Sequence, residues 1–413
     1  VFIEKFIVGP RHIEIQILAD EFGNMVYLGE RECSVQRRHQ KVIEESPSSL
    51  VDDTMRKEMG EQALLLARAV NYSSAGTVEF VASNDKSFYF LEMNTRLQVE
   101  HPVTELVTGI DLVEKMINIS AKKPLGLTQS DIKMNGWSVE ARIYAEDPIR
   151  NFAPSIGRLK TFKSPSENSS SIRLDSGVQE GGEISMYYDP MIAKLISYGK
   201  DRDDACLKLS SALDTFFISG LETNIAFVNS VLNNKKFLSG NITTAFLEEE
   251  YPKGYSGLLK SKSKLFLISL VALAMEAIKK YRNQNLTAET CVVIISKLDF
   301  TISYKMVYNQ TKNIYDFSII FKEQSYDFSI KWDIGYPLLS ISMDKHTSIL
   351  QVTNDTSKYR IKHAGFDIYA TVRENDIYKL SKLIPKKAKN NLSKLLLSPM
   401  PGQVVKVCVQ ENQ

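Results

Sequence analysis

Alternating hydrophobic and polar positions at the start of the chain predict β-strands. The segments 2–8 and 12–18 both alternate with a period of two, so one face of each strand is apolar. Gly9-Pro10 stands between them and is typical of a turn. The first residues are therefore expected to pair as antiparallel strands.

The same alternation runs through residues 88–102, which we interpret as one extended segment. Alternate side chains of a strand share a face, and one face here would carry Glu92, Asn94, Arg96, Gln98 and Glu100. Residues 76–81 predict a partner strand, and a hairpin with Val81 opposite Phe90 places Glu79 opposite Glu92. Facing carboxylates repel, which a divalent cation would relieve. Two Glu side chains and Asn94 suit Mg²⁺ or Mn²⁺, although a solvated strand face remains an alternative.

After the first strands, the sequence predicts two helices and then a second α/β unit. Residues 53–70 have an apolar face, and Asp52 or Asp53 is placed to cap this helix. That face consists of Met55, Met59, Ala63, Leu66 and Val70. Another helix is expected from Thr108, and it ends before a boundary near residues 120–135. A second unit then opens with a strand at 138–144, whose even positions project Glu140, Arg142 and Tyr144 together. Arg142 also suits an ordinary surface ion pair.

The pattern changes again after about residue 255. An apolar helix is predicted at 264–281, and short strand-like stretches alternate with polar turns through about residue 380. One helix followed by many antiparallel strands favours a sheet or barrel that wraps around the helix. Residues 385–391 form a polar linker, and another strand unit begins at Ser398.

A basic run at residues 30–42 has two interpretations. It contains Arg31, Arg37, Arg38 and Lys41. Such a run is commonly a solvated face, but the apolar segments beside it make an anion-binding edge an equal alternative. We expect Glu30 and Glu32 to form ion pairs with Arg37 and Arg38.

Charge and cysteine content narrow the function classes. The net charge of +2 over 413 residues gives no general reason to expect nucleic acid or a membrane surface as a partner. The four cysteines, Cys33, Cys206, Cys291 and Cys408, are far apart in sequence, which argues against structural zinc and disulfides. The apolar run at 265–274 is too short to cross a bilayer. The chain begins at Val1 and stops within a strand pattern, and we expect it to be part of a longer protein.

Several of these segments together resemble the biotin carboxylase component of biotin-dependent carboxylases. The matching phrases are Glu4-Lys-Phe, Pro10-Arg-His12, Gln36-Arg-Arg-His-Gln-Lys41, Gly76-Thr-Val-Glu-Phe80, Leu91-Glu-Met-Asn-Thr-Arg-Leu-Gln-Val-Glu-His-Pro102 and Glu146-Asp-Pro148. The likeness extends from residue 1 to about residue 250. The region after it resembles the domain through which acyl-CoA carboxylase α subunits dock their β subunit, and Ser398-Pro-Met-Pro-Gly402 resembles the opening of a biotinyl domain.

The resemblance implies an α+β multidomain fold. It implies the C-terminal half of an ATP-grasp domain at 1–120 and a biotin carboxylase C-terminal domain at 135–250. A docking domain built of a helix and an antiparallel β-barrel is implied at 255–390, and the start of a biotinyl domain at 396–413. The implied partners are a carboxyltransferase β subunit and the biotinyl domain, and the implied location is the mitochondrial matrix.

Roles are implied residue by residue. Catalytic roles fall to Arg96, Glu100 as general base, and Arg142. ATP contacts fall to Glu4, Lys5, Phe6, Ile7, His12, His39, Glu79 and Glu92. The implied metal ligands are Glu79, Glu92 and Asn94. The implied bicarbonate site is Lys41, Arg96, Gln98, Val99 and Arg142, and biotin would meet Arg142 and Phe152. Singly, His12, His39 and Gln98 also suit ordinary hydrogen-bonded strand positions.

The implied reaction joins bicarbonate to biotin at the expense of ATP, with Mg²⁺ or Mn²⁺ as the metal. Two features of the family are not found in the sequence: a Gly-rich lid on the N-terminal side of Glu4, and a Met-Lys-Met biotin acceptor. We therefore expect the full subunit to be the enzyme and this stretch alone to be inactive. The alternatives are another acyl-CoA carboxylase α subunit, a non-catalytic form that only docks the β subunit, and an ATP-grasp ligase of the carbamoyl-phosphate synthetase type.

Overall fold

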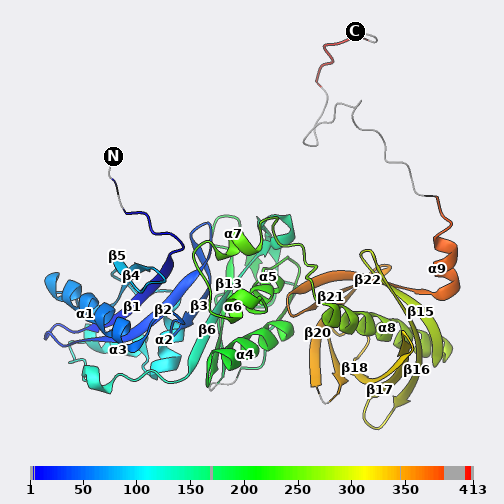
Figure 1. The fold of residues 1–413 in the computed structure, drawn as a ribbon, viewed down its shortest axis with the longest axis horizontal. Helices are drawn as coiled ribbons and strands as arrows, with labels where there is room; N and C mark the ends of the chain where they lie inside the picture. The colour runs from blue at the N-terminus through cyan, green and yellow to red at the C-terminus, as the bar shows by residue number, and fades with distance from the viewer. Residues whose placement is uncertain (1–2, 4, 168–170, 345, 386–404, 411–413) are drawn as a thin grey trace.

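The computed structural model describes residues 3, 5–167, 171–344, 346–385 and 405–410. Two bodies lie side by side in it (Figure 1): an α/β body that ends with α7 (Phe246–Glu250) and a β-barrel that begins with α8 (Lys262–Gln284). Glu4, the predicted linker beyond Pro385 and the Ser398–Gly402 motif lie outside the described residues. The strand predicted at 2–8 is not formed by its described members, which lie in an irregular segment before β1.

An eight-stranded antiparallel sheet forms the centre of the α/β body, in the order β11-β13-β6-β3-β2-β1-β4-β5. Its strands are β1 (Arg11–Ala19), β2 (Met25–Arg37), β3 (Gln40–Ser46), β4 (Ser74–Ala82), β5 (Phe88–Asn94), β6 (Trp137–Tyr144), β11 (Ile172–Ser176) and β13 (Met191–Gly199). The pairing of β3 with β6 runs one sheet through both predicted α/β units. Side chains from either unit can therefore meet on one face of that sheet.

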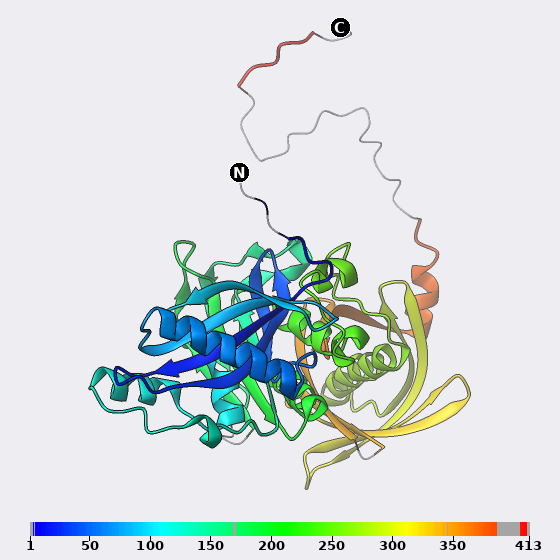
Figure 2. The ribbon, with the colours of Figure 1, turned by 60° about the vertical axis from the view of Figure 1, so that its left-hand side comes forward.

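Short elements complete this body. Three two-stranded sheets pair β7 (Glu146–Asp147) with β8 (Ala153–Pro154), β9 (Gly157–Arg158) with β12 (Glu183–Ile184), and β10 (Thr161–Lys163) with β14 (Phe217–Ser219). The helices are α1 (Asp53–Ala69), α2 (His101–Thr108), α3 (Leu112–Ser120), α4 (Arg202–Thr215), α5 (Ile225–Leu232) and α6 (Lys235–Leu238), with 3-10 turns at Gln129–Asp131 and Pro148–Arg150. Figure 2 shows α1 lying across the strands at the N-terminal end of the body.

The helix α1 forms where its periodicity predicts it. The side chain of Asp52 accepts a hydrogen bond from the Met55 amide at 2.9 Å and so caps the first turn. Met55, Met59 and Ala63 are buried against β1 and β4 in one apolar cluster. The prediction is wrong for Val70, which is 63% exposed because the helix ends at Ala69.

The helix predicted from Thr108 starts four residues later, at Leu112, and a separate helix precedes it. The first helix, α2, ends at Thr108, because Gly109 takes the left-handed conformation with φ of 71°. The second, α3, starts at Leu112, where the Asp111 side chain accepts a hydrogen bond from the Glu114 amide at 2.8 Å. Thr108-Gly109 therefore ends a helix rather than beginning one.

The hairpin of β4 and β5 confirms one predicted pair and contradicts the other. Glu79 lies opposite Glu92, as predicted, but Val81 faces Tyr89 and not Phe90, because the register shifts after Glu79. The extended segment is also shorter than predicted: β5 ends at Asn94, and the chain then turns into α2. The alternation of polar side chains beyond Asn94 therefore does not reflect a strand.

The second body is a closed barrel that wraps around one helix, as predicted. Its strands are β15 (Ala288–Ile295), β16 (Leu298–Asn309), β17 (Ile314–Phe321), β18 (Gln324–Lys331), β19 (Leu338–Met343), β20 (His346–Asp355), β21 (Lys358–His363) and β22 (Phe366–Glu374), followed by α9 (Asn375–Ser381). Tyr315, Phe317 and Ile319 alternate inward and pack in one core with the buried residues of α8. The interior is thus filled by the helix.

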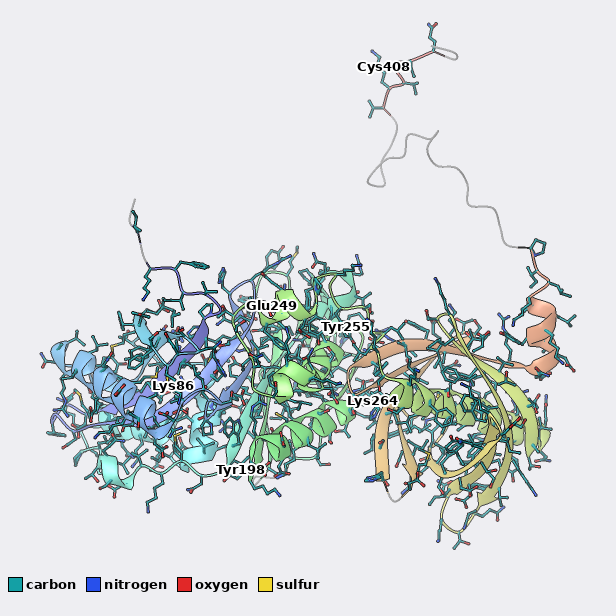
Figure 3. All side chains as sticks on the ribbon, viewed as in Figure 1. Lys86, Tyr198, Glu249, Tyr255, Lys264 and Cys408 are labelled. Atoms are coloured by element: carbon teal, nitrogen blue, oxygen red, sulfur yellow. The ribbon has the colours of Figure 1, made fainter. Side chains whose placement is uncertain are left out.

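Specific contacts join the two bodies. The Tyr255 hydroxyl donates to the Gly365 carbonyl at 2.6 Å, and Lys264 Nζ donates to Asn233 Oδ1 at 2.8 Å (Figure 3). A Cβ on Gly365 would lie 2.3 Å from the Ser230 Cα, so the β21–β22 turn approaches α5 very closely. These contacts place the barrel firmly against the α/β body.

The cysteines and the helices of the described residues give two further findings. All four cysteines are unpaired thiols, and Cys33, Cys206 and Cys291 are buried. None of the helices in the described part of the chain is both long and apolar enough to cross a membrane.

Candidate active site

A pocket of about 680 Å³ lies on the sheet where the β4–β5 hairpin, the β2–β3 turn and β6 meet. Its lining residues are His12, Gln36, Arg38, His39, Gln40, Lys41, Glu79, Leu91, Glu92, Asn94, Arg96, Gln98, Val99, Glu100, Arg142, Tyr144 and Asp189. Every predicted metal, bicarbonate and catalytic residue is among them. The five polar side chains predicted to share a strand face converge here, although a strand places only the first two.

A row of charged residues crosses four neighbouring strands beneath this pocket. Arg31 on β2 is opposite Glu14 on β1, Glu14 is opposite Glu79 on β4, and Glu79 is opposite Glu92 on β5. Adjacent carboxylates in such a row repel one another. Arg31 at one end of the row compensates Glu14, and Lys41 Nζ, from outside the row, lies 3.5 Å from Glu79 Oε1.

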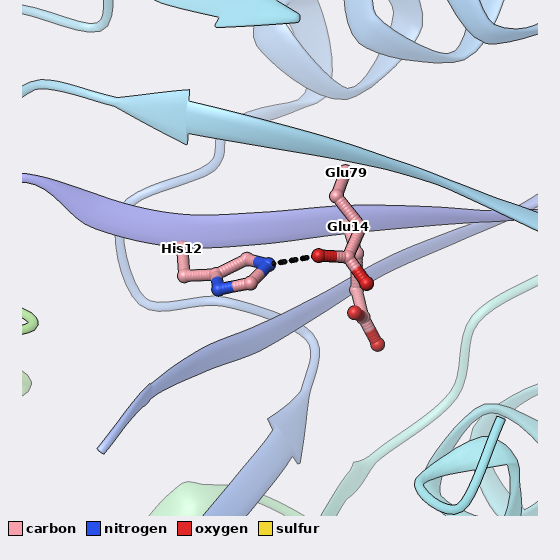
Figure 4. A group of neighbouring side chains, drawn as sticks. All are labelled: His12, Glu14 and Glu79. Atoms are coloured by element: carbon pink, nitrogen blue, oxygen red, sulfur yellow. Dashed lines mark hydrogen bonds and ion pairs between the residues drawn. The ribbon is translucent and has the colours of Figure 1, made fainter. Parts of the chain in front are cut away.

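His12 and Glu79 interact directly, as Figure 4 shows. His12 Nε2 lies 2.7 Å from Glu79 Oε2, and Glu14 lies beside them, since the donor atoms of all three residues fall within 4.8 Å of one another. Glu14 is unsuited to a metal, because Arg31 and Lys41 contact its two oxygens at 2.5 Å and 2.6 Å. The acids available to a cation are therefore Glu79 and Glu92.

The predicted metal ligands fit a hard divalent cation. Asn94 Nδ2 lies 3.0 Å from Glu79 Oε1 and 3.1 Å from Glu92 Oε1, so one amide bridges both carboxylates. Rotation of the amide by 180° would present its oxygen together with theirs, which makes the oxygen donor set that Mg²⁺ and Mn²⁺ prefer. Burial opposes the charged form of Glu79, but the hydrogen bond with His12 and the charge of Lys41 lower its pKa to about 2. Glu79 is thus ionised and ready to bind a cation at neutral pH.

Two cations hold Glu100 from opposite sides. The carboxylate contacts Lys41 Nζ, and Arg142 Nη2 donates to its other oxygen at 3.0 Å. Glu100 stands at the N-cap position of α2 without a side-chain capping hydrogen bond, and only 2% of its surface is exposed. Burial favours the neutral amine, but the acidic groups around it, Cys33, Glu14 and Glu100 among them, raise the pKa of Lys41. The pocket therefore contains an anchored carboxylate with its cations fixed beside it.

Arg96 is an exposed cation of the pocket. Its guanidinium is exposed and makes only long contacts, at 3.3 Å to the Leu97 carbonyl and 3.2 Å to Asn94 Oδ1. Gln98 is buried and donates to Glu79 Oε1 at 2.6 Å, while the Val99 carbonyl accepts from Lys194 Nζ at 2.8 Å. The fork of Arg96 is thus free to bind a planar anion bidentately.

Arg31 is a buried residue beneath this site to which sequence reasoning gave no individual role. It is fully buried, and its five N–H groups all have acceptors. These acceptors are Glu14 at 2.5 Å, Gln16 at 2.7 Å, Thr104 at 3.0 Å, Thr77 at 3.1 Å and Gln98 at 2.7 Å. Because Arg31 occupies the oxygen of Gln98, the amide nitrogen of Gln98 must face Glu79 and the pocket. The only sequence signal was a cation within an alternating strand pattern.

The residues of the basic run at 30–42 have two kinds of surroundings. Arg38 and His39 form the β2–β3 turn with φ of 51° and 65°, and both side chains line the pocket. Arg37 instead donates two hydrogen bonds to Glu146, at 2.8 Å and 2.9 Å. The ion pairs predicted for two acids of the run are wrong: Glu30 pairs with Arg56, and Glu32 pairs with Arg11.

Some predicted ligand contacts lie outside the pocket. Lys5, Phe6 and Ile7 are not among its lining residues; Phe6 is 86% exposed, and Lys5 Nζ donates to the Tyr89 hydroxyl at 2.6 Å. Phe152 lies beneath the Arg37 guanidinium, 4.2 Å from its ring centre, and packs edge-on against Phe227. The structure does not bring these residues to the carboxylates.

Several lining residues were not among the individual ligand-binding residues predicted from the sequence, namely Gln36, Arg38, Gln40, Leu91, Tyr144 and Asp189. Gln36 Nε2 lies 2.8 Å from His12 Nδ1 and so orients that ring toward Glu79. The first three residues belong to the basic run, so their place in that run was the available signal.

Three protein-family models match successive parts of the chain. Residues 1–128 match the carbamoyl-phosphate synthase L chain ATP-binding domain, residues 140–249 the biotin carboxylase C-terminal domain, and residues 271–387 the propionyl-coenzyme A carboxylase BT domain. Together with the sheet, the pocket and the barrel, these matches define the class of protein. The chain belongs to the biotin carboxylase family of biotin-dependent carboxylases.

Individual proteins that are similar to this chain include α subunits of acyl-CoA carboxylases. The propionyl-CoA carboxylase alpha chain of Ruegeria pomeroyi is 43% identical over 100% of this chain and 64% of its own length. The human mitochondrial propionyl-CoA carboxylase alpha chain is 43% identical over 99% of this chain and 58% of its own. The mitochondrial methylcrotonoyl-CoA carboxylase subunit alpha of Dictyostelium discoideum is 38% identical, over 99% of this chain and 60% of its own. The chain thus spans about three fifths of the length of these curated relatives.

Solved structures agree with the sequence matches. The biotin carboxylase domain of Hydrogenobacter thermophilus 2-oxoglutarate carboxylase, in complex with MgADP, ADP and bicarbonate, superposes with a TM-score of 0.58 at 45% identity. The superposition covers 60% of this chain and 54% of that one. A biotin carboxylase from Campylobacter jejuni, in complex with an ATP analogue, matches with the same TM-score at 44% identity, over 60% of this chain and 54% of its own.

Proposed function

We propose that this chain carries the metal, bicarbonate and biotin sites of a biotin carboxylase, the activity that joins bicarbonate to biotin at the expense of ATP. The observation that carries the proposal is the arrangement of Glu100 between Lys41 and Arg142, next to the free fork of Arg96 and the Glu79–Glu92 pair. A base, an anion clamp and a carboxylate pair then surround one space.

The carboxylate pair serves the nucleotide end of the pocket. Glu79, Glu92 and Asn94 would hold Mg²⁺ or Mn²⁺, which neutralises phosphate oxygens and makes the terminal phosphoryl group of ATP transferable. His12 and His39 line the same end of the pocket, and we propose that both contact the nucleotide. His12 also keeps Glu79 in place, because its ring is held between Gln36 and that carboxylate.

The chemistry on bicarbonate falls to Arg96 and Glu100. Arg96 binds the planar anion through two parallel N–H donors, an arrangement that a lysine cannot reproduce. Glu100 takes the bicarbonate proton as general base while the bicarbonate oxygen attacks the γ-phosphorus of ATP. The products are ADP and carboxyphosphate, and the latter breaks down to CO₂ and phosphate in a site that must exclude water.

The last step falls to Arg142. The phosphate released from carboxyphosphate takes the proton of the ureido nitrogen of biotin, which puts negative charge on the ureido oxygen, and a guanidinium beside that oxygen stabilises it. Arg142 lies against Glu100 and so stands next to where the CO₂ forms. Carboxybiotin results when the deprotonated nitrogen attacks CO₂. We keep Phe152 as a proposed neighbour of the biotin ring, reached only after movement of Arg37.

The acyl-CoA and the partner are proposed from the barrel. Its match to the propionyl-coenzyme A carboxylase BT domain, together with the named relatives, favours an α subunit of propionyl-CoA carboxylase. In that role the barrel docks a carboxyltransferase β subunit, and carboxybiotin on a biotinyl domain carries the carboxyl group that turns propionyl-CoA into methylmalonyl-CoA. The 38% identical methylcrotonoyl-CoA carboxylase subunit supports 3-methylcrotonyl-CoA as the second candidate substrate. Several relatives are named mitochondrial, so we propose the mitochondrial matrix as the location.

The test is bicarbonate-dependent ATP cleavage with free biotin, measured on the protein as its gene encodes it. Glu100→Gln should lower this rate by about 100-fold or more, because the amide cannot accept the bicarbonate proton. The control is Glu114→Gln, at an exposed carboxylate in the first turn of α3. Equal rates in both variants would refute the role of the base. Co-purification with the β subunit by a Glu100→Gln protein, combined with no carboxylation by the wild type, would instead support a docking function alone.

A further inference from the structure

A second pair of carboxyl groups lies behind Arg142. Glu44 on β3 and Glu140 on β6 are directly opposite each other, and neither has any exposed surface. Side chains at opposite positions of antiparallel strands lie about 5 Å apart at their Cβ atoms. Two buried carboxylates at that separation would repel each other strongly.

The hydrogen bonds of this pair are incomplete. Arg142 Nε donates to Glu44 Oε1 at 2.5 Å. The other three oxygens, Glu44 Oε2 and both oxygens of Glu140, have no hydrogen-bond partner among the described residues. A buried carboxylate without a donor is costly to keep ionised.

Nearby cations are already engaged. The charge of Lys194 on β13 acts to lower the pKa of Glu140, but Lys194 Nζ donates to the Val99 carbonyl at 2.8 Å and lies 3.2 Å from Asp175. Arg142 binds Glu44 and, on its other side, Glu100 at 3.0 Å. Neither cation donates to Glu140.

Protonation of one carboxyl group would remove the repulsion and supply a hydrogen-bond donor, with no further residue needed. A protonated carboxyl group is a hydrogen-bond donor, and the vacant Glu44 Oε2 is an acceptor directly across the strands. Burial and the neighbouring charge of Glu44 raise the pKa of Glu140 well above its usual range. Burial also raises the pKa of Glu44, although Arg142 opposes that shift. The proton therefore belongs on Glu140, with the negative charge on Glu44.

We propose that Glu140 holds a proton that it donates to Glu44, so that the pair carries one negative charge and positions Arg142 for the anionic form of biotin. The inference deepens the proposed function and rests on it for the part that concerns biotin. With Glu140 neutral, Arg142 is balanced between Glu44 and Glu100. With Glu140 ionised, a third carboxylate would compete for the same guanidinium.

The protonation is tested first, by infrared difference spectroscopy on the chain in H₂O and D₂O near neutral pH. Wild type minus Glu140→Gln should show the C=O band of a protonated carboxyl group that shifts in D₂O. The matched control is Glu32→Gln, a buried carboxylate whose Oε2 accepts from Arg11 at 2.6 Å and from Ser48 at 2.7 Å. The same band in the Glu32→Gln difference, or none in the Glu140→Gln difference, would overturn the proposal.

The folding equilibrium gives a second test. Glu140 is faced by Glu44 on β3, Arg142 on its own strand, Lys194 on β13 and Glu100 before α2. Its folded-state pKa is raised, so the wild type keeps a proton that the unfolded chain releases above the usual carboxyl pKa. As the pH rises above the usual carboxyl pKa, wild-type folding should therefore weaken relative to Glu140→Gln by up to about tenfold, or about 1.4 kcal/mol, per pH unit. A ratio independent of pH would contradict a proton on Glu140.

The role of Glu44 in positioning Arg142 is tested in the protein as its gene encodes it. Glu44→Gln removes the charge that holds Arg142, so the KM for free biotin should rise roughly ten- to 100-fold more than the KM for ATP. Glu44→Asp should restore part of the loss. An equal rise in both KM values would overturn the positioning role. Absence of any biotin-dependent activity in the wild type would refute the proposed function instead, while the infrared band still reports on the proton.

Discussion

Replacement of Arg31 by lysine tests whether a single buried guanidinium organises the bicarbonate end of the site. Arg31 donates five hydrogen bonds from a fully buried position, and the ammonium group of lysine has only three N–H donors. At least two of the five acceptors would therefore lose their partner. An unsatisfied buried acceptor costs about 1–3 kcal/mol, so Arg31→Lys should lower the free energy of unfolding by about 2–6 kcal/mol.

The assay is urea-induced unfolding of the chain, followed by circular dichroism, with Arg56→Lys as the matched control. Arg56 donates to Glu30 at 2.6 Å and 2.9 Å and to Asp53 at 2.6 Å, but its side chain is 21% exposed. Water can replace part of these bonds, so the control should lose only about 1 kcal/mol. Equal losses in the two variants would refute the reasoning.

The same substitution should also change binding. Gln98 presents its amide nitrogen to Glu79 because Arg31 occupies the amide oxygen. Release of that oxygen lets the amide turn over, and the KM for bicarbonate should rise by about tenfold or more. A KM for bicarbonate that rises no more than the KM for ATP would show that Arg31 serves the fold alone.

Three other predictions follow from the structure. Glu79→Gln or Glu92→Gln should weaken Mn²⁺ binding by about tenfold or more, measured by electron paramagnetic resonance, and near-normal binding in both would refute the metal assignment. Although burial opposes the shift, the charges of Arg31 and Lys41 lower the pKa of Glu14 to about 2. The ionised Glu14 side chain therefore stabilises the fold by about 3 kcal/mol above about pH 4.5, and this stabilisation is lost as the pH falls toward 2. The difference in unfolding free energy between wild type and Glu14→Gln should shrink over that range, and a constant difference would contradict the prediction. Gly365→Ala should lower the unfolding midpoint more than Gly335→Ala, since φ is 85° and 91° but only the first Cβ meets another backbone.

Local patterns predicted the elements of this fold well. Strand patterns located β1, β4 and most of β5, helical spacing located α1, and a long apolar run located α8. The predicted barrel also formed, because alternating strands and one apolar helix leave few other ways to bury both. The pattern failed at residues 95–100, where polar side chains alternate by coincidence within a turn.

The site required information that no local pattern holds. The pair of Glu79 and Glu92 follows from hairpin geometry and was confirmed. The contact of Glu100 with Arg142 depends instead on the pairing of β3 with β6, which joins distant segments. Arg31 is buried only because five acceptors from other elements surround it, so its own segment gave no sign of that burial.

The most direct test of the account is fixation of ¹⁴C-bicarbonate by the protein as its gene encodes it, together with its β subunit. Propionyl-CoA and 3-methylcrotonyl-CoA would be compared side by side in the presence of ATP and Mg²⁺. The account predicts ATP-dependent fixation that prefers propionyl-CoA and that is lost in Glu100→Gln. Preference for 3-methylcrotonyl-CoA would keep the active-site assignments and overturn the proposed substrate. Fixation that persists in Glu100→Gln, or no fixation by the wild type with either substrate, would contradict the central claim.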